Sequence, residues 1–319
     1  VKAGNIYALN DFESERIRID SILKEKGYYH FNPEYLLFTA DTSAEFGKAK
    51  IRLRLKNDMP AEAAVAYKLS DVYVFDDYSL RDYTPDTTKI DNYNYVSHDH
   101  MFKPQIILNS ILIEKDKLYS KKDHFNSIRN LMGIGVYKFA IIRFADDDSL
   151  SGLMKANVFL TPYKKISLSA EMSAAIKSTG FAGPGLKLSY KNKNAFGGAE
   201  LFAITLGGNF ETQTKGDTKG QTSYQVTLDA SLTLPKFEPI KFGRKGSNLI
   251  FPRTIFTAGI GIYSRVNLYD LRSFSTSIGY SWRSNEKVSH LFRPMDISYT
   301  NLGKTTAEFD QYLEENPTV

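Results

Sequence analysis

An alternation of apolar and polar residues fills the second half of the chain and restricts the fold more than any other feature. After Pro162, residues of one kind recur at every second position. A period of two is typical of a strand with one apolar and one polar face, whereas a helix has a period of 3.6. We therefore predict seven strands. The alternation is clear in 186–191, 201–207, 224–234, 255–263 and 274–282, and weaker in 166–174 and 295–301.

The length and chemistry of these segments favour strands that cross a membrane. Four of them are 9–11 residues long, which is the length that a tilted strand needs to span a bilayer. Lys187, Lys191 and Asp229 lie on the polar face, where a water-filled interior would hold them. A soluble sheet with one wet face has the same period and is the alternative. The aromatic residues expected at the membrane surface are Tyr190, Tyr263, Tyr280 and Trp282.

The first half of the chain mixes helical and strand patterns, and one order of elements occurs in it twice. Helices are predicted over 11–26 and 121–132, the first ended by Gly27 and the second by Gly133 and Gly135. Two strands follow each helix, and the first copy lacks the strand and short helix that open the second. The predicted strands are 35–39, 49–56, 67–75, 136–144 and 154–160, and the short helix is 104–111.

Several polar or glycine-rich segments are expected to be turns and loops. Segment 79–102, rich in tyrosine and aspartate, is expected to be a loop inserted in the second copy. The carboxylates at 76–77 and 146–148 are typical of turns, so acid–base catalysis is not expected there. The glycine pairs at 197–198 and 207–208 are expected to bend or bulge the sheet.

The composition excludes several kinds of chemistry. The chain has no cysteine, so it can form no disulfide, thiolate nucleophile or cysteine–zinc site. Its net charge is +5, but no cluster of lysine or arginine exists, and we expect no nucleic-acid partner. His98 and His100 flank Asp99 without a third metal ligand, so a solvated loop is the better interpretation. With no nucleotide-binding or hydrolase motif either, we expect no enzyme activity, catalytic residue, cofactor or metal.

The sequence contains no candidate for a membrane-spanning helix. Its seven predicted strands are also too few to form a closed sheet in a membrane without an open edge. No apolar run reaches the roughly 18 residues of a transmembrane helix, and no signal peptide opens the sequence. A sheet edge left open in hydrocarbon is not tolerated, and seven strands would leave one. We therefore expect the natural protein to be longer.

Several segments resemble the BamA-type family of outer-membrane assembly proteins. Residues 118–125 (LYSKKDHF) and 128–139 (IRNLMGIGVYKF) resemble the last periplasmic POTRA module of that family. Residues 156–162 (ANVFLTP) resemble the strand that leads into its barrel. The family's later barrel strands, with their lumen-reaching loop motif, have no counterpart here. Further similar segments are 27–29 with 34–35 in a preceding module, 190–200 in an early barrel hairpin, and 279–282 and 293–297, which resemble members from Bacteroidetes.

The resemblance implies a fold of α+β POTRA modules followed by antiparallel transmembrane β-barrel strands that form a partial barrel. It places a partial POTRA-like module at 1–60 and a second one, with the polar loop insertion, at 61–163. The N-terminal part of the barrel would be 164–319. The implied location is the bacterial outer membrane, with the modules in the periplasm.

The resemblance also implies a function in outer-membrane protein assembly. The modules would receive unfolded β-barrel precursors, and the first barrel strand would open as a lateral gate. Accessory assembly proteins and outer-membrane lipid would be further partners. The alternatives are a related transporter that secretes a partner protein, a passive structural barrel, and a soluble binding protein. The candidate gate strand, with small side chains and one glutamate, comprises Ser167, Leu168, Ser169, Ala170, Glu171, Met172 and Ser173.

Overall fold

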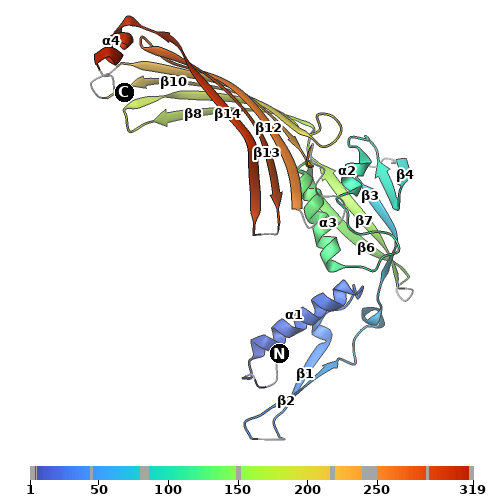
Figure 1. Ribbon diagram of the computed structural model, residues 1–319. Helices are drawn as coiled ribbons and strands as arrows, with labels where there is room; N and C mark the ends of the chain where they lie inside the picture. The colour runs from blue at the N-terminus through green and yellow to red at the C-terminus, as the bar shows by residue number, and fades with distance from the viewer. Residues whose placement is uncertain are drawn as a thin grey trace. The chain divides into compact units, whose positions relative to one another are not determined.

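The computed structural model places the chain in two compact units (Figure 1). The modular unit comprises Val1–His100, Pro104–Met132 and Tyr137–Pro162. The strand unit comprises Met101–Lys103, Gly133–Val136 and Tyr163–Val319. The predicted division of the chain into domains 1–60, 61–163 and 164–319 stays a prediction. The structure describes residues 4, 6–43, 46–79, 86–148, 152–215, 220–238, 250–284 and 287–315.

The modular unit opens with a helix and a two-stranded sheet, as predicted. Helix α1 (Leu9–Glu25) is followed by Gly27, whose φ of +97° suits a glycine at a helix end. Phe12 of α1 is buried against Phe38, with ring centroids 5.0 Å apart. The remaining elements of this part are η1 (Pro33–Tyr35), β1 (Leu36–Asp41), β2 (Lys50–Leu55) and η2 (Ala61–Ala64).

The second part of the modular unit is a five-stranded sheet with two helices. Its strand order is β4-β5-β3-β7-β6, where β3 is parallel to both β5 and β7, and β6 is antiparallel to β7. The strands are β3 (Lys68–Phe75), β4 (Asp86–Ile90), β5 (Tyr93–Ser97), β6 (Tyr137–Asp148) and β7 (Leu153–Pro162), and the helices are α2 (Pro104–Leu108) and α3 (Lys121–Ile134).

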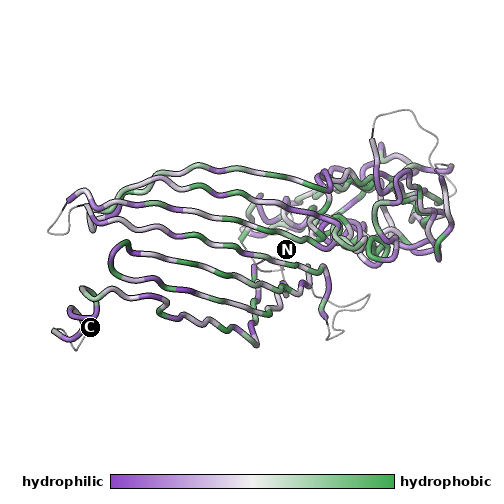
Figure 2. Tube along the Cα trace, turned by 90° about the horizontal axis from the view of Figure 1, so that it is seen from above, coloured by the Kyte–Doolittle hydropathy of each residue, from purple (hydrophilic) through white to green (hydrophobic). Residues whose placement is uncertain are grey.

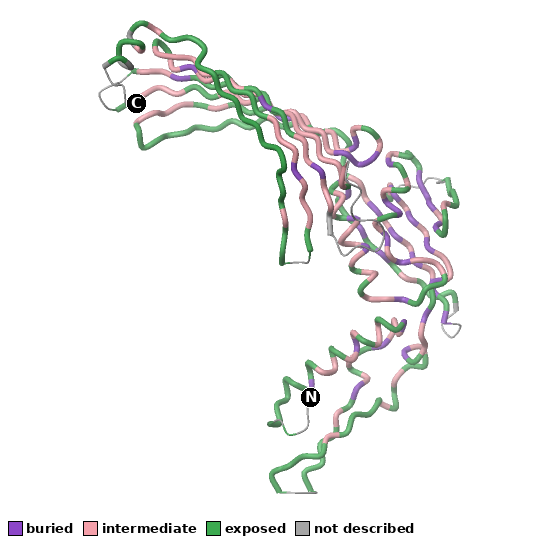
Figure 3. The backbone as a smooth tube through the Cα atoms, viewed as in Figure 1, coloured by how far each residue is buried: buried purple, intermediate pink, exposed green. Residues whose placement is uncertain are grey.

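The core of the chain lies in this five-stranded part, where Figure 3 shows the buried residues concentrated. Every second residue of β7 from Met154 to Leu160 is buried, within the segment 154–160 that was predicted to be a strand. Leu131 of α3 is also fully buried. Each large apolar side chain removed from water contributes about 1.5–3 kcal/mol. The principal buried side chains are Leu69, Val72, Val74, Ile107, Leu108, Ile111, Leu131, Met154, Val158 and Leu160.

Carboxylates and aromatic rings join the two parts of the modular unit. Glu25, in the last turn of α1, accepts hydrogen bonds from the Ser120 hydroxyl and the Lys122 amide, both at 2.7 Å. It thereby satisfies a free N–H at the start of α3. The Tyr29 ring packs edge-on against Tyr119, with centroids 4.9 Å apart.

The prediction that 79–102 is a loop was wrong for its second half. Residues 86–97 form the hairpin β4–β5, and β5 extends the sheet beside β3. Tyr93 and Tyr95 are buried because their hydroxyls reach polar partners, the carbonyl of Ile113 and the Asp76 carboxylate. Polar composition suggested a loop, but a tyrosine can be buried once its hydroxyl is hydrogen-bonded. Residues 80–85 lie outside the described part.

Two predicted boundaries also need correction. Helix α3 continues through Gly133 to Ile134, and of the two glycines predicted to end it only Gly135, with a φ of +86°, follows its end. The acidic segment 146–148 is the end of β6 and not a turn. Asp146 and Asp147 have partners there, because His30 contacts Asp146 at 3.0 Å and the Ser70 hydroxyl donates to Asp147 at 2.6 Å.

The buried Asp76 carboxylate makes the stability of the β4–β5 hairpin depend on pH. Burial raises the pKa of Asp76 from 3.8 to about 6, although hydrogen bonds from Tyr95 and Ser97 oppose the change. Because the pKa is higher in the folded state, the stabilisation is complete below pH 3.8 and is lost as the pH rises through about 6. A pKa difference of this size between the folded and unfolded states corresponds to about 3 kcal/mol.

We therefore expect hydrogen exchange of the β5 amides, corrected for intrinsic rates, to show a more stable hairpin at pH 5 than at pH 7.5. Asp76→Asn should remove most of this difference while keeping an acceptor for Tyr95. An equal pH dependence in both proteins would show that another group is responsible.

The strand unit contains one antiparallel sheet of seven strands in sequence order, as predicted. Figure 1 shows them side by side as a curved sheet. The sheet is open between its two edge strands, β8 and β14, so barrel closure stays a prediction. The strands are β8 (Ile166–Ile176), β9 (Phe181–Asn192), β10 (Leu201–Gln213), β11 (Thr222–Leu234), β12 (Ile250–Arg265), β13 (Tyr269–Arg283) and β14 (Ser289–Thr305), and helix α4 (Ala307–Glu315) follows.

The strand pairing keeps one face of this sheet apolar and the other polar, and Figure 2 shows the alternation along the strands. Because the register is regular over most of its length, one row of partners across all seven strands is apolar and the adjacent row is small or polar. The apolar row is Ala170, Leu188, Leu206, Leu228, Ile260, Phe274 and Tyr299. The polar row is Ser169, Ser189, Thr205, Asp229, Gly259, Ser275 and Ser298.

Of the four predicted interfacial aromatics, Tyr263 lies on the wrong face. It is paired with Gln225 and Leu271, which places it on the polar face of the sheet. Tyr190, Tyr280 and Trp282 lie on the apolar face, as expected. The parity of a position within its strand decides its face, and Tyr263 has the parity of the polar residues. No helix in the described parts of the chain is long and apolar enough to cross a membrane.

Candidate functional site

The seven predicted gate residues all lie on β8, at one edge of the seven-stranded sheet. Among the described strands, β8 pairs only with β9. Every residue of β8 is exposed, and the side chains of Leu168 and Met172 are 79% and 85% accessible. The strand therefore presents both its side chains and one backbone edge.

The outer backbone edge of β8 is formed by its even-numbered residues. At the two ends of the hairpin, Lys193 donates its amide to the Lys165 carbonyl and Lys177 donates to the Phe181 carbonyl, both at 2.8 Å. Antiparallel pairs alternate, so the odd residues of β8 bond to β9. The N–H and C=O groups of Leu168, Ala170 and Met172 consequently point away from the sheet, where an incoming strand could bond to them.

The side chains of β8 divide between the two faces by the same parity. Leu168, Ala170 and Met172 extend the apolar face. The other four predicted residues, Ser167, Ser169, Glu171 and Ser173, extend the polar face. Glu171 is directly opposite Lys187 of β9. A strand added to this edge would match the sheet only if its own residues alternated in the same way.

The ladder between β9 and β10 is interrupted near the far end of this edge hairpin. Pairing is regular at Gly185 with Asn209 and at Ala182 with Thr212, but the two residues between them, Gly183 and Pro184, are unpaired with β10. Proline has no N–H to donate. A β-carbon on Gly183 would collide with the carbonyl oxygen of Phe210.

Beyond the interruption, the tip of the β8–β9 hairpin is fastened to β10 by separate contacts. Lys177 forms an ion pair with Glu211 at 2.6 Å. The Thr214 amide donates to the Gly180 carbonyl at 2.8 Å. The edge hairpin is thus held to the sheet at its base and at its tip, with a weak point between them.

The two edges of the seven-stranded sheet cannot pair with each other in an antiparallel way. Seven successive antiparallel strands leave β8 and β14 running in the same direction. An antiparallel partner for β8 must therefore be a strand other than β8–β14. Among the described strands, none lies along the outer edge of β8.

A second long edge lies in the five-stranded sheet of the modular unit. The β4 edge is short and polar, whereas β6 at the other edge has 12 residues. Phe139 and Ile141 of β6 are 54% and 46% exposed, while Ala140 and Ile142 face the core. We did not predict this edge. The signal was present, because 139–142 is apolar at four successive positions, which is more than a strand with one wet face needs.

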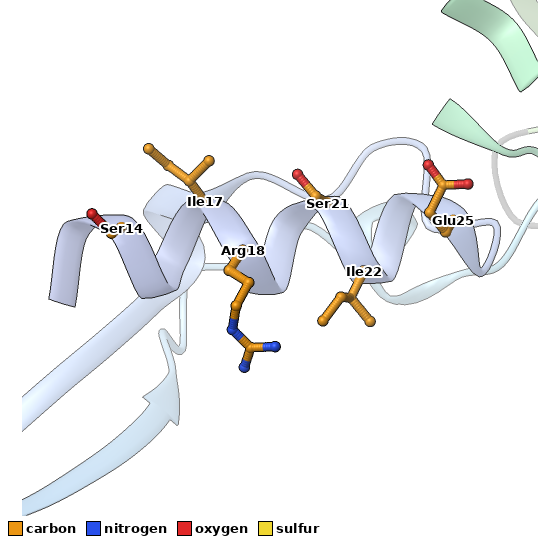
Figure 4. A pocket seen from close by; sticks show the side chains of 6 residues that line it. All are labelled: Ser14, Ile17, Arg18, Ser21, Ile22 and Glu25. Carbon is orange, nitrogen blue, oxygen red and sulfur yellow. The ribbon is translucent and has the colours of Figure 1, made fainter. Parts of the chain in front are cut away.

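An apolar groove runs along the exposed side of α1 (Figure 4). Ile17 and Ile22 are both exposed large apolar side chains. The small residues Ser14 and Ser21 lie between longer ones, and this leaves the groove. None of the described residues covers it. Its lining residues are Ser14, Ile17, Arg18, Ser21, Ile22 and Glu25.

The described residues offer no candidate metal site, at His98 and His100 or elsewhere. No group of three or more His, Asp or Glu side chains in that part of the chain could hold a metal ion. His98 and Asp99 follow β5, and their backbone amides donate to the Asp77 carboxylate at 2.8 and 2.9 Å. These contacts fix the turn after the hairpin.

Comparison with known proteins finds no match to a protein family or a curated protein, and only weak similarity to solved structures. No protein-family profile and no curated protein matches the chain. Among solved structures, BamA from Haemophilus ducreyi lacking POTRA domains 1–3 has a TM-score of 0.44 at 9% identity, covering 95% of this chain and 59% of that one. CdiB from Acinetobacter baumannii has a TM-score of 0.33 at 10% identity, covering 94% and 51%. CdiB from Escherichia coli has 0.32 at 10%, covering 93% and 54%.

The chain thus spans between one half and three fifths of these solved structures. At these TM-scores the similarity supports no conclusion about function. The strand register and the exposed edges are the observations that bear on function.

Proposed function

We propose that this chain is part of an outer-membrane protein assembly factor of the BamA type, in which β8 is the gate strand. The observation that carries the proposal is the β8 edge, whose outward backbone groups and two-faced side chains fit an incoming barrel strand. The seven-stranded sheet has an apolar face that suits lipid and a polar face that suits a watery interior. Its location would be the bacterial outer membrane.

The modular unit would form the periplasmic part. Its elements β3, α2, α3, β6 and β7 follow the order strand–helix–helix–strand–strand, with β3 and β7 parallel. This order, together with the sequence segments at 118–139, supports a POTRA module into which β4–β5 is inserted. The exposed β6 edge offers a first place where an unfolded precursor could bind in an extended form. Accessory assembly proteins and outer-membrane lipid would be further partners.

Strand addition explains how such a site would work without a nucleotide or a metal. Each backbone hydrogen bond to the β8 edge contributes about 0.5–1.5 kcal/mol in water and more where water is excluded. Several bonds formed in register would hold a precursor strand while its apolar residues enter lipid.

The direct test is conditional depletion of the full-length protein, followed by quantitation of folded barrel proteins in the outer membrane. We expect a broad loss of many folded barrels, because a general assembly factor serves many precursors. Loss of one secreted partner with other barrels unchanged would contradict general assembly and identify a dedicated transporter. An unchanged set of barrels and secreted proteins would identify a passive barrel.

A further inference from the structure

The two-stranded sheet of the modular unit has one face that packs against α1 and one face that is open to solvent. Phe38 of β1 points toward α1, where its ring contacts Phe12. Successive residues of a strand point to opposite sides of the sheet. The odd-numbered residues of β1 therefore lie on the face away from α1, which we name the helix-free face. These residues are Leu37, Thr39 and Asp41, and all three are exposed.

Strand β2 places only basic side chains on the helix-free face. The residues of β2 that pair with the three exposed residues of β1 are Arg54, Arg52 and Lys50. All three are exposed, and Figure 3 shows β2 exposed over most of its length. Alternate residues of a strand are roughly 7 Å apart. Lys50, Arg52 and Arg54 thus form a line of three positive charges, which we name the basic row.

The basic row has no counter-charge within the described part of the chain. None of the described residues forms an ion pair or a hydrogen bond with the side chains of Lys50, Arg52 or Arg54. Asp41 is paired with Lys50 in the sheet, but its carboxylate accepts hydrogen bonds from the Ser43 amide at 3.0 Å and the Ser43 hydroxyl at 2.6 Å. Like charges on neighbouring side chains repel each other. Anionic groups of a binding partner would remove this repulsion.

We propose that the basic row binds an extended acidic segment of another protein. A segment with carboxylates at every second residue repeats at the same spacing of roughly 7 Å, so its acidic side chains meet the basic ones one to one. Arginine suits this role, because its planar guanidinium binds a carboxylate through two parallel hydrogen bonds. Leu37 is 39% exposed beside Arg54 and offers an apolar contact next to the row. The proposal does not depend on the gate at β8, because the row belongs to the modular unit.

The shape of the basic row favours a polypeptide over a lipid bilayer as the partner. Its charges lie on one strand only, and the adjacent residues of β1 are apolar, neutral and acidic in turn. A bilayer surface is broad, so contact with it would bring the Asp41 carboxylate against lipid phosphates. An extended segment is as narrow as the row, since neighbouring strands lie about 4.8 Å apart.

The test measures the binding of two labelled peptides to the 319-residue chain by fluorescence anisotropy. One peptide alternates glutamate with threonine, and the other has glutamine in place of glutamate. The chain is held in phosphatidylcholine nanodiscs at low salt, where exposed ion pairs are least screened. We expect the glutamate peptide to bind about tenfold more tightly, because several ion pairs form together. Equal binding of the two peptides would overturn the proposal.

Paired substitutions identify the basic row as the binding surface. Arg52→Gln with Arg54→Gln should abolish the preference for the glutamate peptide, and an unchanged preference would contradict the proposal. Lys68→Gln with Lys89→Gln is the matched control, because it removes the same charge from two exposed residues of the five-stranded sheet. It should leave the preference unchanged. Arg52→Glu with Arg54→Glu should reverse the preference in favour of a peptide that alternates lysine with threonine, which a failure to fold could not do.

Co-sedimentation of the nanodiscs with phosphatidylglycerol vesicles tests the membrane surface as the alternative partner. We expect the native chain and the variant with Arg52→Gln and Arg54→Gln to sediment equally. Weaker sedimentation of the variant, with no peptide preference in the native chain, would assign the row to lipid headgroups and refute the acidic segment. Failure of the chain to enter nanodiscs would contradict the outer-membrane location alone, and the same peptides would then be tested with the chain in buffer.

Discussion

Replacement of Ala170 by proline is expected to reduce outer-membrane protein assembly at least tenfold while β8 stays paired with β9. Ala170 is an even residue of β8, so its N–H points away from the sheet and makes no bond to β9. Proline is tolerated on an edge strand when the missing N–H faces outward. An incoming strand would lose one bond and keep an unsatisfied carbonyl in lipid, which costs several kcal/mol. A loss of about 1.4 kcal/mol is already a factor of ten.

Two substitutions at neighbouring positions serve as controls for Ala170→Pro. Ala170→Val keeps the outward N–H and should retain assembly activity. Ser169→Pro removes an N–H that bonds to β9 and should disrupt the β8–β9 ladder itself. The measurement is the rate at which folded barrel proteins appear when each variant replaces the native protein. Full activity of Ala170→Pro would contradict strand addition at β8.

Replacement of Gly183 by alanine is expected to destabilise the folded sheet by about 3 kcal/mol, the upper end of the usual cost of overpacking. The added β-carbon would collide with the Phe210 carbonyl oxygen and lie 2.8 Å from the Glu211 α-carbon. Both are backbone atoms, which cannot rotate away as a side chain could. The β9–β10 contact would have to open at its existing weak point.

Gly208→Ala is the matched control, because it makes the same chemical change on the neighbouring strand. Its added β-carbon would meet a single atom within contact distance, the Gln225 carbonyl oxygen at 4.0 Å. We expect Gly208→Ala to leave stability nearly unchanged. Heat-dependent mobility on gels, which separates folded from unfolded barrels, measures both variants. Equal mobility profiles would show that the close approach at Gly183 relaxes without cost.

Much of the secondary structure could be predicted because it depends on local periodicity. The alternation after Pro162 predicted seven strands, and the spacing of apolar residues predicted α1 and α3 to within a few residues at their ends. The seven gate residues were expected in one strand, and they form most of β8. Their role as a gate stays a prediction.

The hairpin β4–β5 could not be predicted, because its stability depends on residues distant in sequence. The polar composition around Tyr95 suggested a loop. In the structure its hydroxyl donates to the Asp76 carboxylate at 2.5 Å, and this bond allows the tyrosine to be buried. The same holds for Phe237, which follows β11 with no pattern of its own and whose ring packs against Tyr280 and Trp282 of β13.

The sequence by itself determined which residues share a face, because successive side chains of a strand point in opposite directions whatever its neighbours are. Only the tertiary structure decided which strands are edges and which backbone groups are free. Those properties depend on register and on the order of strands, and one step in register moves a whole strand to the other face. The outward direction of the Ala170 N–H and the lack of space for a β-carbon at Gly183 therefore follow only from the pairing of the strands.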